Sequence, residues 1–326
     1  MAELESPAPA RRVLITGVTN PLARQLAEEL LLDGAVEFVA GVDTVEEPYY
    51  FRDLDRSRFL YKRANIYKSR ELGNLFLSED FRAARINTVV HASFAPPLTG
   101  LQVPIATPLS TNVQGTKQLL ERCIESPDIR RFIFLSSFLV YQVRPGSGTY
   151  LDETADLNFD ADAERPIQDR VDADMLCRTW FESDKLDIAV LRPAPIIGRN
   201  IDGPLNLYLD APFCPVPMGF DPIVNPIHAR DVVRALQLLV HRDVKGVFNV
   251  AGKEMAPLSF FIRMAGATRV PIPASTVRPS ARLLRFIRAS RFDHTFGGCL
   301  LRYPCLLDTR KARELLGFEP NFHIKF

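Results

Sequence analysis

Short apolar runs alternate with amphipathic segments through the first part of the chain. The apolar runs cover residues 13–16, 37–43, 58–62, 86–90 and 131–135, and helical patterns cover 22–32, 69–81, 107–126 and 166–183. The runs are short and rich in β-branched or aromatic residues, which is typical of buried strands. Strands that alternate with helices of this length form right-handed crossovers. The pattern therefore predicts an α/β fold with a doubly wound parallel sheet covered on both faces.

A glycine turn joins the first apolar run to the first helical pattern. Gly17 follows the run and permits a tight turn, and Pro21 stands where a helix accepts proline best. Amides at the start of such a helix face the pyrophosphate of a dinucleotide. Asn20 and Ala23 occupy the places of the second and third glycines of the usual pattern. We expect Asn20 to keep the turn in a left-handed conformation, which Asn tolerates better than most residues.

Asp43 ends the second apolar run, about twenty residues after the turn. A carboxylate at this place can accept hydrogen bonds from the ribose hydroxyls of adenosine, and it would repel a 2′-phosphate. The cofactor predicted from the turn and this acid is NAD(H) rather than NADP(H). The alternative is an aspartate that only caps a strand-to-loop turn.

Composition excludes several classes of protein. The 326 residues are 47% hydrophobic and 24% charged, and the net charge of +1 gives no global field for nucleic acid. Five cysteines without a Cys-x-x-Cys pair argue for a reducing compartment and against a metal site. Residues 1–10 are expected to form a flexible N-terminus without a signal peptide, and no apolar run is long enough to span a membrane. We therefore expect a cytoplasmic protein.

Further motifs follow in the order of a known family, the extended short-chain dehydrogenase/reductases. Besides Thr16-Gly17 and Asp43, the resemblance rests on Asn65-Ile66 and on residues 91–93, 111–116, 135–141, 191–198, 227–233, 247–252 and 307–320. This family includes NAD-dependent epimerases and dehydratases of nucleotide sugars and the 3β-hydroxysteroid dehydrogenases. The resemblance implies a Rossmann-type NAD-binding domain at 11–195 with a returning segment at 226–252. It also implies a smaller, discontinuous substrate lobe at 196–225 and 253–326.

The resemblance assigns cofactor contacts residue by residue. The expected cofactor-binding residues are Gly17, Thr19, Asn20, Pro21, Leu22, Asp43, Asn65, Ile66, His91, Ala92, Asn112, Arg170, Pro193 and Ile196. Of these, Asn65-Ile66 would lie near the adenine, and His91 would lie near the backbone of the cofactor rather than act as a base. The resemblance also implies structural roles for Tyr141 and His228.

The chain departs from the family at the catalytic residues. Family enzymes transfer a hydride with a Tyr as acid/base, a Lys four residues later and a Ser that polarises the substrate oxygen. Ser137 matches the serine. Aligning Asp174 with the family's acidic residue puts Pro166 at the Tyr position and Arg170 at the Lys position. Proline transfers no proton, so the resemblance implies a lost or altered reaction. Asp169 is a possible replacement base, although acids early in a helix usually complement its dipole.

The substrate side has also changed. Pro195 stands where nucleotide-sugar enzymes of the family carry an Asn, and Val224 and Asn225 stand where they carry an Arg. These differences argue against a sugar nucleotide and favour a small hydrophobic ligand. Residues 279–292 form a basic amphipathic pattern, which can lie on an anionic membrane or pack within the lobe. Helices at 107–126 and 166–183 are candidates for a homodimer interface of the family's type.

Three functional hypotheses follow. The leading one is an NAD-binding protein with a degenerate active site that serves as a cofactor-dependent binding or regulatory protein. The alternative is an active oxidoreductase or epimerase-like enzyme that uses Ser137 with another acid/base on a hydrophobic alcohol or ketone. In the third, even the nucleotide is lost, because Asn20 and Pro21 have altered the phosphate loop.

Overall fold

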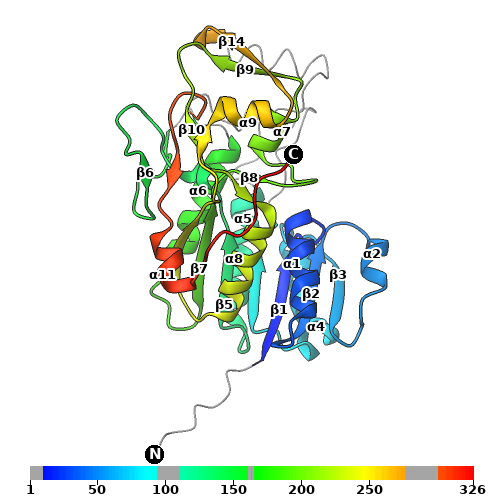
Figure 1. Ribbon diagram of the computed structural model, residues 1–326. Coiled ribbons are helices and arrows are strands. Elements are labelled where there is room, and N and C mark those ends of the chain that lie inside the picture. The colour runs from blue at the N-terminus through cyan, green and yellow to red at the C-terminus, as the bar shows by residue number, and fades with distance from the viewer. Residues whose placement is uncertain (1–9, 94–110, 161–162, 164, 277–299) are drawn as a thin grey trace, which may run out of the picture.

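A computed structural model describes residues 10–93, 111–160, 163, 165–276 and 300–326 (Figure 1). The basic amphipathic pattern at 279–292 and nearly all of the expected flexible N-terminus lie outside the described residues. The predicted helix at 107–126 begins outside them as well.

A seven-stranded sheet forms the centre of the larger domain, and all of its strand pairs are parallel. Its strands are β1 (Arg11–Thr16), β2 (Val36–Asp43), β3 (Phe59–Arg63), β4 (Thr88–His91), β5 (Arg131–Leu135), β7 (Asp187–Pro193) and β12 (Gly246–Val250). Their order is β12-β7-β5-β4-β1-β2-β3. The strand order reverses beside β1, and ligands of such sheets bind at the carboxyl ends of the strands near this reversal.

Helices cover both faces of the sheet, as the sequence predicts. One face carries α1 (Pro21–Leu32), α8 (Ala229–His241) and α11 (Arg310–Leu316), whose buried side chains share one hydrophobic core. The other face carries α3 (Ser69–Leu77), α4 (Glu79–Ala83), α5 (Thr111–Glu125) and α6 (Arg165–Arg178), which enclose a second core. The inner strands are therefore buried on two sides, which explains their nearly continuous apolar runs, whereas the edge strand β3 is only partly buried.

Two predicted helices differ from the structure. The pattern at 69–81 forms two helices, because Ser78 adopts an extended backbone (φ −65°, ψ 142°) and its hydroxyl donates to the Leu75 carbonyl at 2.8 Å. Serine competes with helical hydrogen bonding in this way. The helix predicted at 166–183 ends at Arg178, so Trp180 follows it in a turn and packs partly buried against the second core.

The smaller lobe is built from discontinuous segments after β7. It contains β8 (Ile196–Ile197), α7 (Pro204–Leu209), β9 (Phe213–Pro217), β10 (Ile223–Val224), β13 (Ala256–Pro257), α9 (Leu258–Met264), β14 (Thr268–Ile272) and η2 (Ala274–Thr276). Its core also includes Leu301 and Ile324. The remaining elements are α2 (Tyr49–Arg52), η1 (Phe138–Val140), β6 (Tyr150–Leu151), β11 (Ile227–His228) and β15 (Leu306–Leu307). In Figure 1 this lobe lies above one half of the sheet.

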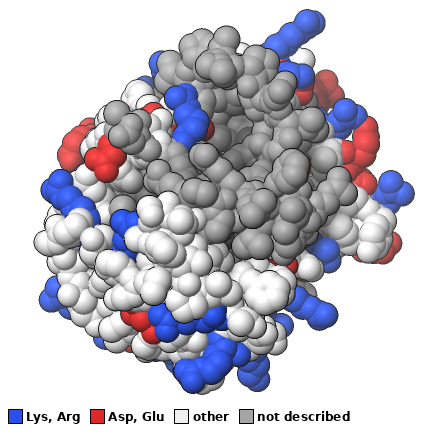
Figure 2. Space-filling view, turned by 90° about the horizontal axis from the view of Figure 1, so that it is seen from above, with Lys and Arg blue, Asp and Glu red and all other residues white. Residues whose placement is uncertain are grey.

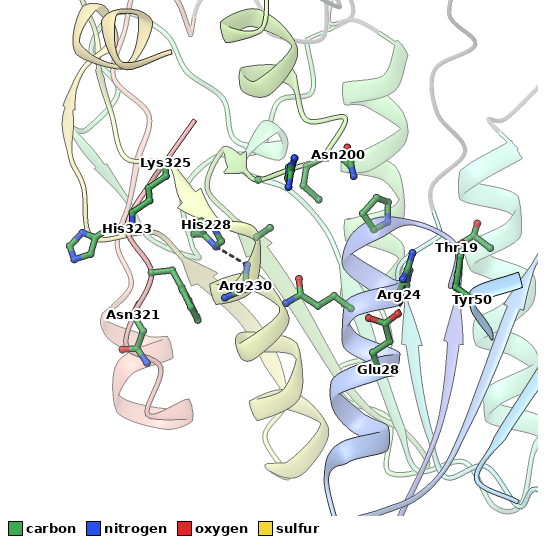
Figure 3. Close-up of a pocket in the computed structure, with 17 residues that line it drawn as sticks. Thr19, Arg24, Glu28, Tyr50, Asn200, His228, Arg230, Asn321, His323 and Lys325 are labelled. Carbon is green, nitrogen blue, oxygen red and sulfur yellow. Dashed lines mark hydrogen bonds and ion pairs between the residues drawn. The ribbon is translucent and has the colours of Figure 1, made fainter. Parts of the chain in front are cut away.

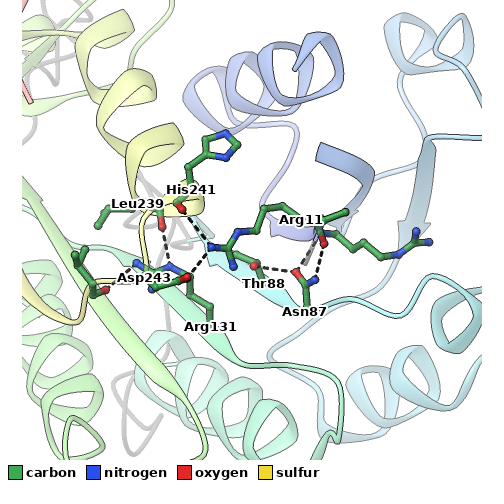
Figure 4. Close-up of polar contacts among 10 residues, drawn as sticks. Arg11, Asn87, Thr88, Arg131, Leu239, His241 and Asp243 are labelled. Atoms are coloured by element: carbon green, nitrogen blue, oxygen red, sulfur yellow. Dashed lines mark hydrogen bonds and ion pairs between the residues drawn. The ribbon is translucent and has the colours of Figure 1, made fainter. Parts of the chain in front are cut away.

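Arginines hold the opposite, amino-terminal edge of the sheet together (Figure 4). Arg131 is buried and donates to the carbonyls of Leu239 and Val244, each at 2.7 Å. Arg11 donates to the His241 carbonyl at 3.2 Å and to Asp243 at 2.6 Å. Burial lowers the pKa of Arg131 to about 10, so the guanidinium stays charged at neutral pH. These contacts fix the end of α8 to the sheet, far from the carboxyl edge.

Surface charge is mixed. Figure 2 shows Lys and Arg side chains at separate places around the face seen from above, with Asp and Glu side chains between them. Within the part of the chain that the structure describes, no helix is long and apolar enough to cross a membrane.

Candidate functional site

The turn after β1 has the geometry that the sequence predicts. Gly17 has φ +68°, and a Cβ there would lie 2.7 Å from the Ser93 Cα. The Gly17 amide donates to the Val42 carbonyl at 2.8 Å. Both the positive φ and the close approach of Ser93 require glycine. The turn therefore brings the ends of β1, β2 and β4 together at one edge.

Asn20 corrects one prediction. Its backbone is extended (φ −61°, ψ 136°) rather than left-handed, and its side-chain oxygen accepts from the Leu22 amide at 3.0 Å. It is therefore the N-cap of α1, a role that Asn favours strongly. Pro21 stands at the first helical position, as predicted, and has no amide hydrogen. Two of the first three amides of α1 are thus unavailable to an anion.

Asp43 lies at the end of β2 and contacts the turn directly. One carboxylate oxygen accepts from the Thr19 amide at 3.0 Å and from its hydroxyl at 2.6 Å, and the other accepts from the Thr44 amide at 2.7 Å. The second oxygen also accepts from the Thr44 hydroxyl at 3.4 Å, a long bond that a ribose hydroxyl could replace. The arrangement fits both the ribose-binding prediction and the alternative of a turn cap.

Tyr67 crosses from the end of β3 to the end of β4, which the sequence analysis missed. Asn65 starts this loop, and its side-chain oxygen accepts from the Tyr67 amide at 2.9 Å. The Tyr67 hydroxyl lies 2.8 Å from the Ser93 hydroxyl. Its ring packs against Gly115 of α5, where any Cβ would collide with it. Nothing in the local sequence around Asn65-Ile66 signals this crossing, because its partners are 26 and 48 residues away along the chain.

A buried polar network fixes α6 against the sheet. Asp174 accepts from the Ser136 hydroxyl at 2.6 Å and pairs with Arg192 through two bonds at 2.5 and 2.9 Å. Arg192 also donates to the Tyr141 hydroxyl at 3.0 Å, and that hydroxyl donates to Asn249 at 2.7 Å. Burial alone would lower the pKa of Arg192, but its bonds and charge interaction with Asp174 raise it. The structural role expected for Tyr141 is confirmed.

The first turns of α6 carry the residues at the predicted catalytic positions. Pro166 is partly exposed in the first turn, and Arg170 follows one turn later. Burial lowers the pKa of Arg170 to about 10, while Tyr67 and Asp169 act in the opposite direction, so Arg170 stays protonated at neutral pH. Ser137 is partly exposed after β5, and its side chain accepts from the amide two residues later at 3.3 Å.

Asp169 is buried beside α5. Its carboxylate lies 3.5 Å from the side-chain amide nitrogen of Asn112 and 3.0 Å from the guanidinium Nε of Arg165, one turn earlier in α6. The residue is only 6% exposed. The structure therefore brings together Asn112, Asp169 and Arg170, three residues that the sequence singled out.

His91 lies inside the sheet region rather than at its surface. Its ring is 1% exposed, lies 2.8 Å from the Thr16 hydroxyl and 3.0 Å from the Thr116 hydroxyl, and packs near Phe132 and Phe134. Burial lowers the pKa of His91 to about 3. Only the backbone of this residue can face a cofactor.

The other predicted residues lie at the same edge. Leu22, Ile66, Ala92 and Pro193 are buried next to strand ends, whereas Ile196 in β8 is partly exposed. On the substrate side, Pro195 is buried, and Asn225 donates its side-chain amide to the carbonyls of Gly252 and Glu254. His228 caps α8 by accepting from the Arg230 amide, which confirms its expected structural role.

Comparison with known proteins identifies the family. The model of the NAD-dependent epimerase/dehydratase family matches residues 13–251. The chain belongs to this family. An uncharacterised protein of Mycobacterium tuberculosis is 29% identical over 98% of this chain and 82% of its own length. A trifunctional UDP-glucose 4,6-dehydratase, epimerase and reductase of Arabidopsis thaliana is 23% identical over 74% of this chain and 37% of its own.

Solved structures share the fold. A dTDP-glucose 4,6-dehydratase of Bacillus anthracis in complex with NAD has a TM-score of 0.67 at 16% identity, covering 96% of this chain and 92% of its own. A UDP-glucuronic acid 4-epimerase of Bacillus cereus, bound to UDP-glucuronic acid and NAD, has a TM-score of 0.67 at 20% identity, covering 95% and 94%. WbmG of Bordetella bronchiseptica in complex with NAD has a TM-score of 0.68 at 17% identity, covering 99% and 92%.

Proposed function

We propose that this family member binds NAD(H) at the carboxyl edge of its sheet, has lost or altered the family reaction, and acts as a cofactor-dependent binding or regulatory protein. The observation that carries the proposal is that Asp174 of α6 is bonded to residues of the sheet region. Its contacts with Ser136 and Arg192 fix α6 in one register, which supports the alignment of Pro166 and Arg170 with the Tyr and Lys positions. Neither side chain can act as a phenolic acid/base or as the lysine that tunes it.

Cofactor binding is supported by the turn and by the acid. Gly17 gives the chain its close turn, and Asp43 offers a carboxylate at the neighbouring strand end. NAD is bound by the three solved structures named above. When bound, NAD would supply a hydride acceptor or donor. This chain's own residues would hold the adenosine ribose at Asp43 and the pyrophosphate at the turn.

Calorimetric titration with NADH and with NADPH tests the proposal. We expect micromolar binding of NADH, weaker binding of NADPH, and a marked loss of NADH affinity in Asp43→Ala. Asp187→Ala is the matched control, because Asp187 is exposed at the amino-terminal end of β7. No heat with either nucleotide would refute cofactor binding and leave the nucleotide-free scaffold, the third hypothesis.

An active enzyme is the second candidate, and the buried carboxylate of Asp169 beside Asn112 favours it. In this case Ser137 would polarise a carbonyl oxygen and Asp169 would exchange the proton. The assay is NADH oxidation with a panel of hydrophobic ketones. Turnover that disappears in Ser137→Ala and falls in Asp169→Asn would refute the proposal of a catalytically inactive binding protein and support the active enzyme. Absence of turnover in a protein that binds NADH supports the first proposal.

The ligand and assembly remain part of the proposal. The loss of the family's Asn and Arg positions, now Pro195 and residues 224–225, supports a small hydrophobic ligand over a nucleotide sugar. UDP-glucose binding by calorimetry would contradict this. We also propose a homodimer formed through α5 and α6, which pack side by side in the chain as such an interface requires, and sedimentation analysis tests it. Peripheral membrane contact through 279–292 and the cytoplasmic location also stay predictions.

A further inference from the structure

A groove lies beside the phosphate turn, between the first turns of α1 and the beginning of α8. This groove has a volume of about 820 Å³, which is in the range of small-molecule sites. Its walls are formed by separate segments: the first turns of α1, Tyr50 of α2, the loop 198–201 after β8, the beginning of α8, and the C-terminal segment 321–325 (Figure 3). Of the residues assigned to the cofactor, only Thr19 and Pro21 line it, and none of the candidate catalytic residues does.

Positive charge is concentrated in this groove. Arg24, Arg199, Arg230 and Lys325 line it, and among the residues that the structure describes Glu28 is its one lining carboxylate. The whole chain has a net charge of only +1, so the excess of cations is local. Glu28 already pairs with Arg24 at 2.8 Å. Like charges held around one concavity repel each other unless an anion lies between them.

The wall formed by the C-terminal segment is held in place. The fully buried carboxylate of Asp231 accepts from the backbone amides of Asn321 and Phe322 at 2.8 and 3.1 Å. The Phe322 ring stacks on the His228 imidazole, with centroids 5.4 Å apart, and the Arg230 guanidinium lies 5.4 Å from its centroid. The C-terminal segment and the start of α8 are therefore held in place before a ligand binds. Binding then costs less conformational entropy for these two segments.

Neutral groups add hydrogen-bonding capacity and shape. Asn200 lines the groove with a left-handed backbone (φ +61°), a conformation that persists where the surrounding structure determines it. On the opposite wall, the Arg24 guanidinium stacks on the Tyr50 ring at 3.8 Å. His228 accepts a backbone hydrogen bond through Nδ1, which leaves Nε2 as a donor in the neutral ring.

We infer that this groove is a binding site for a small phosphorylated molecule, separate from the dinucleotide site. Guanidinium groups bind phosphate oxygens through paired hydrogen bonds, and Lys contributes a point charge. The volume of the groove and its cationic walls fit a compact ligand with two or more negative charges. Thr19 and Pro21 line the groove and are also assigned to the dinucleotide, so the two sites adjoin at the phosphate turn.

Inorganic pyrophosphate is the probe for the test, measured by calorimetry on the full chain at low and moderate salt. We expect saturable binding that weakens with salt. We also expect a more than tenfold loss of affinity in the triple variant Arg199→Ala/Arg230→Ala/Lys325→Ala. The matched control removes three exposed cations elsewhere, Arg70→Ala/Arg82→Ala/Lys117→Ala, and should keep the affinity of the wild type. All six side chains are exposed, so both variants should fold.

Several results would overturn the inference. Absence of pyrophosphate binding, or an equal loss in both triple variants, would mean that the groove has no specific site. An unchanged affinity in the groove variant would place the bound pyrophosphate elsewhere, for example at the phosphate turn. If the groove variant lost NADH affinity to the same extent, the groove would be part of the dinucleotide site. Tighter binding of a single-stranded oligonucleotide, lost in the groove variant, would indicate a nucleic-acid surface instead. Failure of NADH binding alone leaves the inference standing.

Discussion

Lowering the pH below 6.5 should destabilise this fold through His91. Its ring lies between two hydroxyls, and the Thr116 hydroxyl donates its one hydrogen to the Asn112 carbonyl at 2.9 Å. The His91 Nε2 must therefore donate to Thr116, so Nδ1 accepts from Thr16. These contacts fix a neutral imidazole. A proton added to Nδ1 would face a donor and would place an uncompensated charge in the core.

The size of the effect follows from the pKa. Burial lowers the pKa of His91 from about 6.5 to about 3. A base whose pKa is lowered in the folded state binds fewer protons there than when unfolded, so its contribution to stability is present above pH 6.5 and is lost as the pH falls toward 3. Each pH unit in this window costs up to about 1.4 kcal/mol. Between pH 8 and pH 5 the free energy of unfolding should fall by about 2 kcal/mol from this one group.

Urea unfolding at pH 5 to 8 measures this loss. His91→Asn lacks the titrating ring, so its stability should fall less steeply than that of the wild type over this range. His323→Asn, at an exposed position, controls for the substitution itself. Parallel pH profiles for the wild type and His91→Asn would refute the reasoning. So would a ring resonance of His91 in the folded protein that titrates near pH 6.5, a measurement that does not depend on whether the variant folds.

Three further predictions test the site. Arg192→Met leaves the Asp174 carboxylate buried and unpaired, and should lower the free energy of unfolding by about 3–5 kcal/mol; urea unfolding checks this, and Asp174→Leu in the same chain should recover part of the loss. Gly115→Ala should lower the melting temperature because its methyl group meets the Tyr67 ring, and Tyr67→Ala should restore it; no change in the single variant would contradict the packing described. Asn20→Gly frees one amide of α1 and should tighten NADH binding several-fold in calorimetry, while the changed cap costs only a few tenths of a kcal/mol; unchanged affinity would mean that this amide does not contact the phosphates.

The sequence alone predicted the parallel sheet and its two covered faces. Strand and helix periods are local properties, and the handedness of crossover connections then leaves few possible arrangements. Gly17 and Asp43 stood at predicted strand ends, so their neighbourhood followed from the topology. The family pattern also marks Asp174 as the acid within α6. In the structure this carboxylate accepts a hydrogen bond from the Ser136 hydroxyl.

Only the tertiary structure decided the contacts between distant segments. Asn20 could have kept a left-handed turn, but capping the helix satisfies an amide that would otherwise lack a partner, and this sets its backbone. Tyr67 reaches Ser93 because the bare backbone of Gly115 leaves room for its ring. The cations of the groove come from positions 24, 199, 230 and 325. These four positions are far apart in the sequence, and no local pattern around any of them indicates a shared groove. Folding alone places them around it.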